Sequence, residues 1–498
     1  MIKKTNGRAI LSKSTFIRGL QCEKSLYLHK KRPFLRDRLS PEQLAKFSRG
    51  TNVGVYAQQL FPGGVDASPK THFQMAASVV KTAELMEAGQ KIIYEAAFEH
   101  AGVIIALDIL VKNDKGWSAI EVKSSKSISE TYLWDASLQY FVMKGSDIEI
   151  SDFSIAYINT SFVRKGAINP AELFIIESVL HLVLERQEQV GQKIERLKEV
   201  VELKSSPPIS IGPQCHKPYP CDFIGHCWKN IPEGSVFELQ GIDEDLQFKY
   251  FEKGIAKVSD IPETELDAKT ALLHRKSIML GKPIVNIGSL QEFAIRISGE
   301  TAVFSWLDFK PAIPLFDGTK PYQSVPFSLG MKDIRQAGAE LLVYSSAGFP
   351  ERGMLEELLE RLEKHQTILI FGPLPDLNFL LDRCFAGEHL YEKFKEIFSK
   401  AVDISNPFAD YSISWPGMKP GLTPAEILKG LGHEAILPSG EIKSKFEASI
   451  AIEKMASGNQ KSDPEEVFRQ IDEFHAAYLA NIQKLLELII GFLENEKV

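Results

Sequence analysis

Two neighbouring segments of the sequence carry side chains that could hold a divalent metal ion. Asp108 lies in one apolar run, and Glu121, Val122 and Lys123 lie in the next. Alternate residues of a strand share a face, so Glu121 and Lys123 point the same way and Asp108 can join them from the adjacent strand. Two carboxylates are hard oxygen ligands for Mg²⁺ or Mn²⁺, and the Val122 carbonyl could add a third oxygen.

The chemistry that this trio favours is phosphodiester hydrolysis. A divalent metal lowers the pKa of a bound water and offsets the charge of the phosphate, and Lys123 can orient the water or stabilise developing negative charge. Glu95 on the preceding strand could supply another acid, and Gln139 and Tyr140 lie on the helix that follows. A solvent-exposed edge strand is the alternative for an isolated Glu-Val-Lys sequence, and these additional residues favour an active site.

Four of the five cysteines form a second constellation. They are Cys22, Cys215, Cys221 and Cys227. Thiolates are soft ligands that suit an iron–sulfur cluster or zinc, and His216 and His226 keep a zinc site of three cysteines and one histidine open. We recognise no secretion signal, so a disulfide framework is not expected. Cys384 lies among apolar residues and is expected to be a buried thiol.

Elements of two α/β patterns must position these residues. Short β-branched runs predict strands over 92–99, 103–111, 117–122 and 153–159, with helices over 11–31, 41–61, 71–88, 132–143 and 170–203. Short helices are expected over 235–295. A second pattern follows, with strands over 302–309, 341–344 and 367–371 and a helix over 351–364. Apolar residues at helical spacing predict an amphipathic helix over 464–494, which packs on the body or on a partner.

Charge is distributed unevenly along the 498 residues. The net charge is −7, yet residues 1–50 carry 13 Lys plus Arg against 3 Asp plus Glu. Such a basic segment on an acidic body is typical of a nucleic-acid-binding face, with a solvated pair of basic helices as the alternative. No run of about 18 apolar residues stands out, so no membrane span is expected and the cytoplasm is the expected location.

Residues 1–230 resemble the iron–sulfur exonucleases of CRISPR adaptation and the nuclease domains of the RecB and AddB type. The resemblance rests on the order of one cysteine, Asp108, Glu121 to Lys123, Gln139 with Tyr140, and three more cysteines. It implies a PD-(D/E)xK restriction-endonuclease-like sheet with flanking helices, clasped by a 4Fe–4S cluster. The family often has a metal-binding histidine on an early helix, where this chain has Gly54.

The whole chain resembles a bacterial family that joins this module to an RNase H-like DEDD exonuclease domain. Asp308 falls in the first motif, where Lys310 replaces the usual glutamate, and Asp376 and Asp403 match later motifs. A lysine puts positive charge where a cation should bind, so this domain is expected to be non-catalytic. The resulting domains are the nuclease domain 1–230, a helical connector 231–298, the RNase H-like domain 299–460, and a C-terminal amphipathic helix 461–498.

The function expected from the sequence is metal-dependent DNA cleavage, by an exonuclease or an enzyme that acts on single strands or ends. RNA is a second candidate substrate, and the C-terminal domain or helix could hold a protein partner. The alternative is a non-catalytic protein of bacterial defence or DNA repair that binds nucleic acid or a partner. The missing histidine and Lys310 motivate that alternative.

Overall fold

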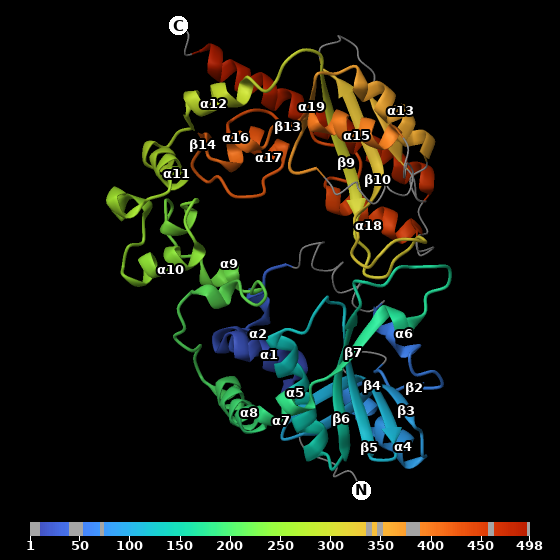
Figure 1. The fold of residues 1–498 in the computed structure, drawn as a ribbon. Coiled ribbons are helices and arrows are strands. Elements are labelled where there is room, and N and C mark those ends of the chain that lie inside the picture. The colour runs from blue at the N-terminus through green and yellow to red at the C-terminus, as the bar shows by residue number, and fades with distance from the viewer. Residues whose placement is uncertain are drawn as a thin grey trace. The chain divides into compact units, whose positions relative to one another are not determined.

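The chain forms two compact α/β units (Figure 1). The computed structural model describes residues 10–38, 53–69, 74–334, 341–345, 352–374, 389–456 and 463–495. Unit 1 comprises Met1–Asn230 and Ala312–Tyr322, and unit 2 comprises Ile231–Pro311 and Gln323–Val498. Each unit contains its own mixed sheet with flanking helices, which confirms the multidomain α/β class. The four-segment division stays a prediction.

Unit 1 is built on a seven-stranded sheet in the order β2-β3-β4-β5-β6-β7, with β1 paired to β4. The strands β3, β4 and β5 are antiparallel, β5 and β6 are parallel, and β7 closes the edge antiparallel to β6. The four strands predicted from β-branched runs are confirmed. The strands are β1 Leu11–Ser12, β2 Val65–Asp66, β3 Ile92–His100, β4 Val103–Asn113, β5 Gly116–Lys123, β6 Ile150–Ile158 and β7 Phe174–Ser178.

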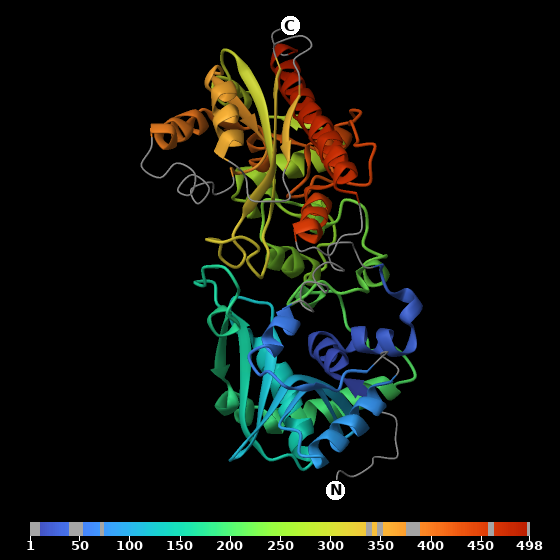
Figure 2. The same cartoon turned by 90° about the vertical axis from the view of Figure 1, so that its right-hand side faces the viewer.

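Helix α5 packs against one face of this sheet, where its buried residues join those of β3, β4 and β6 in one hydrophobic cluster (Figure 2). The Ser129 side chain caps the start of α5 by accepting a hydrogen bond from the Tyr132 N–H. The helices of unit 1 are α1 Lys13–Gln21, α2 Glu23–Lys31, α4 Met75–Glu87, α5 Glu130–Gly145, α6 Pro170–Leu173, α7 Leu180–Glu185, α8 Gln187–Glu202 and α9 Ile224–Cys227, with 3₁₀ turns Pro33–Leu35 and Pro213–Cys215.

Two of the helices predicted for unit 1 are interrupted in the structure. The predicted helix 11–31 is split at Cys22, whose extended backbone ends α1 and begins α2. The predicted helix 170–203 is interrupted by β7, because the run from Phe174 to Ser178 completes the edge of the sheet by pairing with β6. Tertiary pairing of a β-branched apolar segment overrides its helical spacing here.

Unit 2 contains a five-stranded sheet in the order β11-β10-β9-β12-β13. Alternate residues of β9 pack in opposite directions: Phe304 contacts the cluster of α13 and α15, and Val303 contacts that of α19. Strand β10, which the sequence did not predict, pairs antiparallel to β9. The elements are α10 Glu244–Glu252, α11 Lys269–Leu280, β8 Ile284–Val285, α12 Ile287–Ala294, β9 Thr301–Phe309, β10 Val325–Asp333, β11 Leu342–Ser345, α13 Arg352–Glu363, β12 Thr367–Ile370, α15 His389–Ser399, β13 Ala401–Asp403, α16 Asn406–Ala409, β14 Ile413–Ser414, α17 Pro424–Gly430, α18 Lys445–Ala456 and α19 Pro464–Glu494, with 3₁₀ turns Val236–Glu238, Val258–Asp260 and Glu263–Glu265.

The C-terminal helix α19 has the bounds that its amphipathic pattern predicts. By length and composition alone it could cross a membrane, and it is the one helix in the described part of the chain that meets this test. In the structure its apolar face packs against the sheet of unit 2 and against α12 and α17. The same face buries His475 and Asn481, as in the core helix of a folded domain.

Candidate functional site

Three carboxylates lie in one row across β3, β4 and β5. The antiparallel register places Glu95 opposite Asp108, and its continuation into the next strand pair places Asp108 beside Glu121. The backbone N–H of Val122 donates a 2.6 Å hydrogen bond to Asp108 Oδ2, which fixes this side chain against β5. The structure therefore brings together acids that lie 13 residues apart from one strand to the next.

The backbone of β3 and β4 departs from regular pleating at this row. Glu95 has a φ of 52°, a left-handed conformation that costs a non-glycine residue about 1–2 kcal/mol. Residues three positions apart on each strand, rather than two, enter the same hydrophobic cluster: Ile93 with Ala96, and Leu107 with Leu110. Such a step in the alternation re-aims side chains, and strain of this kind concentrates at functional sites.

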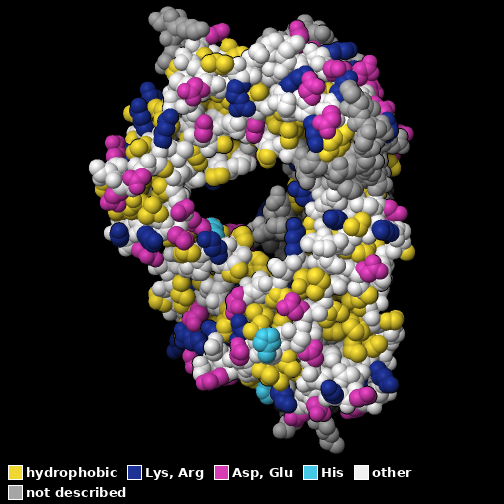
Figure 3. Space-filling model, in the orientation of Figure 1, with side chains coloured by type: hydrophobic (Ala, Val, Ile, Leu, Met, Phe, Trp, Pro, Cys, Tyr) yellow, Lys and Arg dark blue, Asp and Glu magenta, His cyan; other side chains and the backbone are white. Residues whose placement is uncertain are grey.

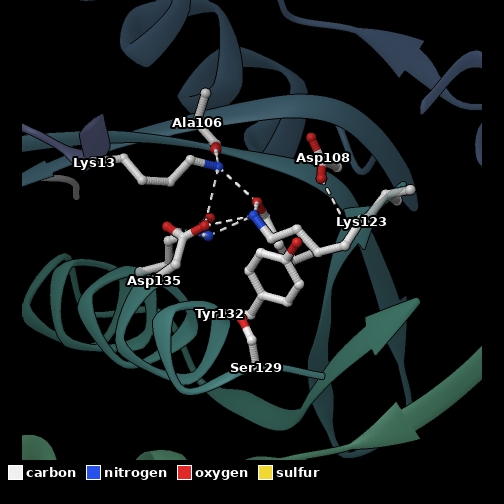
Figure 4. A network of polar contacts seen from close by, with 10 residues as sticks. Lys13, Ala106, Asp108, Lys123, Ser129, Tyr132 and Asp135 are labelled. Atoms are coloured by element: carbon white, nitrogen blue, oxygen red, sulfur yellow. Dashed lines mark hydrogen bonds and ion pairs between the residues drawn. The ribbon is translucent and has the colours of Figure 1, made fainter. Parts of the chain in front are cut away.

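Glu121 is the centre of a buried polar network. Figure 4 shows this network, with Lys13, Lys123 and Asp135 labelled. Its Oε1 accepts hydrogen bonds from two ammonium groups, Lys13 Nζ at 2.7 Å and Lys123 Nζ at 2.6 Å. Its Oε2 accepts one from Gln139 Nε2 at 2.9 Å. Only 2% of the Glu121 side chain is exposed. A buried carboxylate with this many charged donors is held ionised and in one orientation.

Lys123 bridges two acids. Its Nζ lies 2.6 Å from Asp135 Oδ2 and the same distance from Glu121 Oε1, and the Tyr132 ring lies 5.2 Å from it. Sequence reasoning missed Asp135. It lies four residues before Gln139 on α5, so the two share a helix face, and that spacing was an available signal.

The pKa values of the three carboxylates in the row are shifted in both directions. Burial raises the pKa of Asp108 well above its usual range, and the charge of Glu121 raises it further. Burial also acts to raise the pKa of Glu121, yet the ammonium groups of Lys123 and Lys13 bring it below its ordinary value. Burial, followed by the Glu121 charge, raises the pKa of Glu95 against the opposing effect of Lys13. Titratable groups with environments that separate their pKa values are typical of active sites.

The donor set fits a divalent metal and its bound waters. Within the described ranges no three His, Cys, Asp or Glu side chains converge closely enough to hold an ion as they stand. The carboxylates are nevertheless aligned in one row, and Gln139 Oε1 is buried without a hydrogen-bond partner among the described residues. A metal-bound water would satisfy that acceptor. Asp108 and Glu121 would hold the ion, with Glu95 beside them.

Other predicted residues lie less close to this network. Tyr140 packs against the hydrophobic cluster, and no contact described for it reaches the carboxylates. The Val122 side chain packs on the opposite face of the sheet, so its part in the site is its backbone. A Cβ built at Gly54, where the sequence resemblance expects a metal-binding histidine, would meet nothing within 4 Å.

The four predicted cysteines line a single cavity. Cys22 lies at the junction of α1 and α2, and Cys215, Cys221 and Cys227 come from the segment after α8. All four are free thiols. Burial raises the pKa of the Cys22 and Cys227 thiols, and the neighbouring thiols add to the effect. The four distant cysteines thus line one cavity, although in the described geometry they too do not converge closely enough to hold an ion.

The rest of the cavity lining is apolar or neutral apart from Lys24, and the described lining contains neither histidine. His216 instead packs edge-on against Trp228, with ring centroids 5.3 Å apart. The donor chemistry fits a group that takes four thiolates, which an iron–sulfur cluster or zinc does. Cys384 lies outside the described residues.

A charged clasp fixes α1 and α2 to the cysteine segment. Asp222, next to Cys221, accepts hydrogen bonds from the Arg18 guanidinium at both carboxylate oxygens. Arg36 Nε lies 2.6 Å from Asp222 Oδ2. Gln21 Nε2 donates to the carbonyls of Gln214 at 2.8 Å and Tyr219 at 2.6 Å. Helix α1 therefore begins at the carboxylate site, with Lys13, and ends at the cysteine cavity.

The basic residues of the N-terminal sequence predict a positively charged surface, with which the described residues on the face drawn in Figure 3 can be compared. On the face in Figure 3, basic side chains are interspersed with acidic ones and do not form one continuous patch. Part of the basic N-terminal segment, residues 1–9 and 39–50, lies outside the described residues.

In unit 2, Asp308 lies near the end of β9 with positively charged neighbours. Lys310 Nζ is 3.8 Å from Asp308 Oδ2, and the Ser324 hydroxyl donates to the same carboxylate. Lys445 Nζ lies 4.7 Å from the Trp306 ring and 4.9 Å from the Tyr478 ring. Burial lowers the pKa of Lys445 to about 8, while Asp308 acts to raise it.

Asp403, the third acid matched in the C-terminal resemblance, has a structural role in the described geometry. Its Oδ1 accepts hydrogen bonds from the N–H groups of Gly372, at 2.9 Å, and Ser405, at 2.8 Å. These bonds join the turns that follow β12 and β13. Asp376 lies outside the described residues.

Comparison with known proteins adds little. A family model described as Domain of unknown function (DUF2779) matches residues 305–421. A solved structure titled "Crystal structure of SSO0001" is similar at 11% identity, over 42% of this chain and 82% of that chain, with a TM-score of 0.23. A likeness at that level defines neither fold nor function. No curated protein matches the chain.

Proposed function

We propose that unit 1 is a metal-dependent deoxyribonuclease with a PD-(D/E)xK restriction-endonuclease-like sheet. The observation that carries the proposal is the buried network around Glu121, in line with Asp108 and hydrogen-bonded to Lys123 and Gln139. A bound Mg²⁺ or Mn²⁺ supplies an activated water and offsets phosphate charge. The resemblance of residues 1–230 to iron–sulfur exonucleases points to DNA ends or single strands as substrate.

The chain's own residues have distinct parts in this proposal. Asp108 and Glu121 hold the ion, and the strained Glu95 offers a further carboxylate. Lys123 stabilises negative charge that develops on the phosphate. Gln139 Nε2 donates a hydrogen bond to the Glu121 carboxylate and fixes its orientation. The buried Gln139 Oε1 is left to accept a hydrogen bond from a water.

The test of the proposal is cleavage of end-labelled single- and double-stranded DNA, with Mn²⁺ and anaerobically prepared protein. We expect Glu121→Gln and Lys123→Met each to lower the rate at least about 100-fold, because each removes a charge at the reacting phosphate. Glu177→Gln is the matched control, since Glu177 is an exposed acid of the same sheet. A Glu121→Gln, Lys123→Met double variant that cleaves DNA as fast as the wild type contradicts the proposal.

We further propose that the cysteine cavity holds a structural 4Fe–4S cluster. Four free thiols around one cavity, with both histidines absent from its described lining, support a four-thiolate group. The position of the cavity favours a structural role for the cluster, because the cluster would join Cys22, between α1 and α2, to a segment almost 200 residues later. Brown protein with broad visible absorbance and about four irons per chain is expected. Colourless protein with one zinc per chain is the contrary outcome.

A second candidate function is non-catalytic binding of nucleic acid or a protein partner in bacterial defence or repair. It is favoured by unit 2, which we propose to be RNase H-like and inactive, because Lys310 and Lys445 surround Asp308 where a metal would need further acids. We expect the protein to act in the cytoplasm. DNA binding by the wild type with no Mn²⁺-dependent cleavage of any DNA or RNA tested would favour this candidate.

A further inference from the structure

Among the hydrogen-bond partners of Glu121 in the described part of the chain, Lys13 is the one that the sequence did not predict. Two local features of the backbone fix the position of Lys13. The preceding strand β1 pairs with β4, and Ser12 with Thr15 forms a capping box at the start of α1. The side chain then extends beside β4, where its Nζ lies 3.4 Å from the Ala106 carbonyl and 2.7 Å from Glu121 Oε1.

Two cations therefore share a single carboxylate oxygen. Lys123 reaches Glu121 Oε1 from the same strand, and Lys13 reaches it from the first helix. An oxygen with two lone pairs and two ammonium donors has no electron pair left for a metal. A divalent ion that uses this oxygen must replace one of them.

The two lysines are not held equally. Lys123 has a second carboxylate, Asp135, at 2.6 Å and is 17% exposed. Lys13 is 4.0 Å from that same carboxylate and 29% exposed, with a carbonyl at 3.4 Å as its additional acceptor. Lys13 is thus the less firmly bound cation, and its side chain is the more exposed of the two.

We propose that Lys13 is a positioning residue that holds the Glu121 carboxylate in one orientation until a divalent metal takes its place at Oε1. Lys13 and the metal compete for one atom, so Lys13 sets the metal affinity of the site. This inference rests on the proposed function, since it takes Glu121 as a metal ligand. It also gives α1 a part in the chemistry, beyond its attachment to the cysteine cavity.

The test is direct Mn²⁺ binding to the full chain, measured as loss of the free-ion electron paramagnetic resonance signal, without DNA. Lys13→Met removes the competing charge and is expected to tighten Mn²⁺ binding at least about tenfold, or about 1.4 kcal/mol. Lys13→Gln, which keeps a hydrogen-bonding side chain, should shift it in the same direction if Lys13→Met folds poorly. Lys198→Met is the matched control, because it removes a partly exposed lysine of unit 1 that is ion-paired with Glu195 on α8.

The half-saturating Mn²⁺ concentration for cleavage should fall in parallel with the dissociation constant, whatever happens to the maximal rate. Mn²⁺ affinity that is unchanged or weaker in both folded Lys13 variants overturns the inference. Glu121→Gln separates the two ideas. If it abolishes binding while the Lys13 variants behave as wild type, the metal site stands and the part of Lys13 is wrong. If it binds Mn²⁺ as the wild type does, the metal site itself is wrong, and the inference with it.

Discussion

Replacing Asp222 by alanine should release the cysteine segment from α1 and α2. The carboxylate is 13% exposed and is ion-paired with two guanidinium groups, Arg18 at 21% and Arg36 at 35% exposure. Arg18, with Arg36, holds the pKa of Asp222 below its usual range against the effect of burial. Removing one partner of a fully buried pair costs about 3–5 kcal/mol, and the partial exposure of both arginines reduces this to about 2–3 kcal/mol.

The assay combines urea unfolding of the full chain, monitored for the transition of unit 1, with iron content per chain. Glu23→Ala is the matched control, since it breaks the ion pair between α2 and Arg196, which is 53% exposed. That pair should contribute less than about 1 kcal/mol. Asp222→Ala should also lower bound iron, because Cys221 and Cys22 are then held together less firmly. Equal stability of the two variants, with iron unchanged, would refute the reasoning.

Two further predictions concern stability. His475 is wholly buried between the hydroxyls of Ser305 and Ser328, and burial, with Lys445 nearby, lowers its pKa to about 3. The unfolded chain takes up this proton near pH 6.5, so stability should fall by up to about 1.4 kcal/mol per pH unit from pH 6.5 toward 3. His475→Gln should give a shallower pH dependence of the urea midpoint, and an identical slope would count against this account. Glu95→Gly should be about 1 kcal/mol more stable than Glu95→Ala in urea melts because glycine tolerates its φ of 52°, and equal stabilities would argue against strain.

Particular residues show which features of the fold and of the site can be predicted from the sequence alone. Glu121 and Lys123 share a face because strand alternation is a local property, and Asp108 joins them because hairpin neighbours pair. Helix α19 has the predicted bounds because its apolar spacing is regular over 31 residues. The segment from Phe174 was misjudged because its helical spacing was real but β6 offered it an unpaired edge.

What the sequence determined by itself was which side chains are the candidates: acids and a lysine at strand spacing, and cysteines whose thiols could share one group. Only the tertiary structure decided how these groups are charged and held. Lys13 lies 108 residues from the acid that it contacts, and Asp222 lies 204 residues from Arg18. Contacts across such separations depend on how helices pack on the sheet, and local sequence patterns do not predict that packing. The pKa shifts follow from the same packing, because burial and neighbouring charge exist only once the chain has folded.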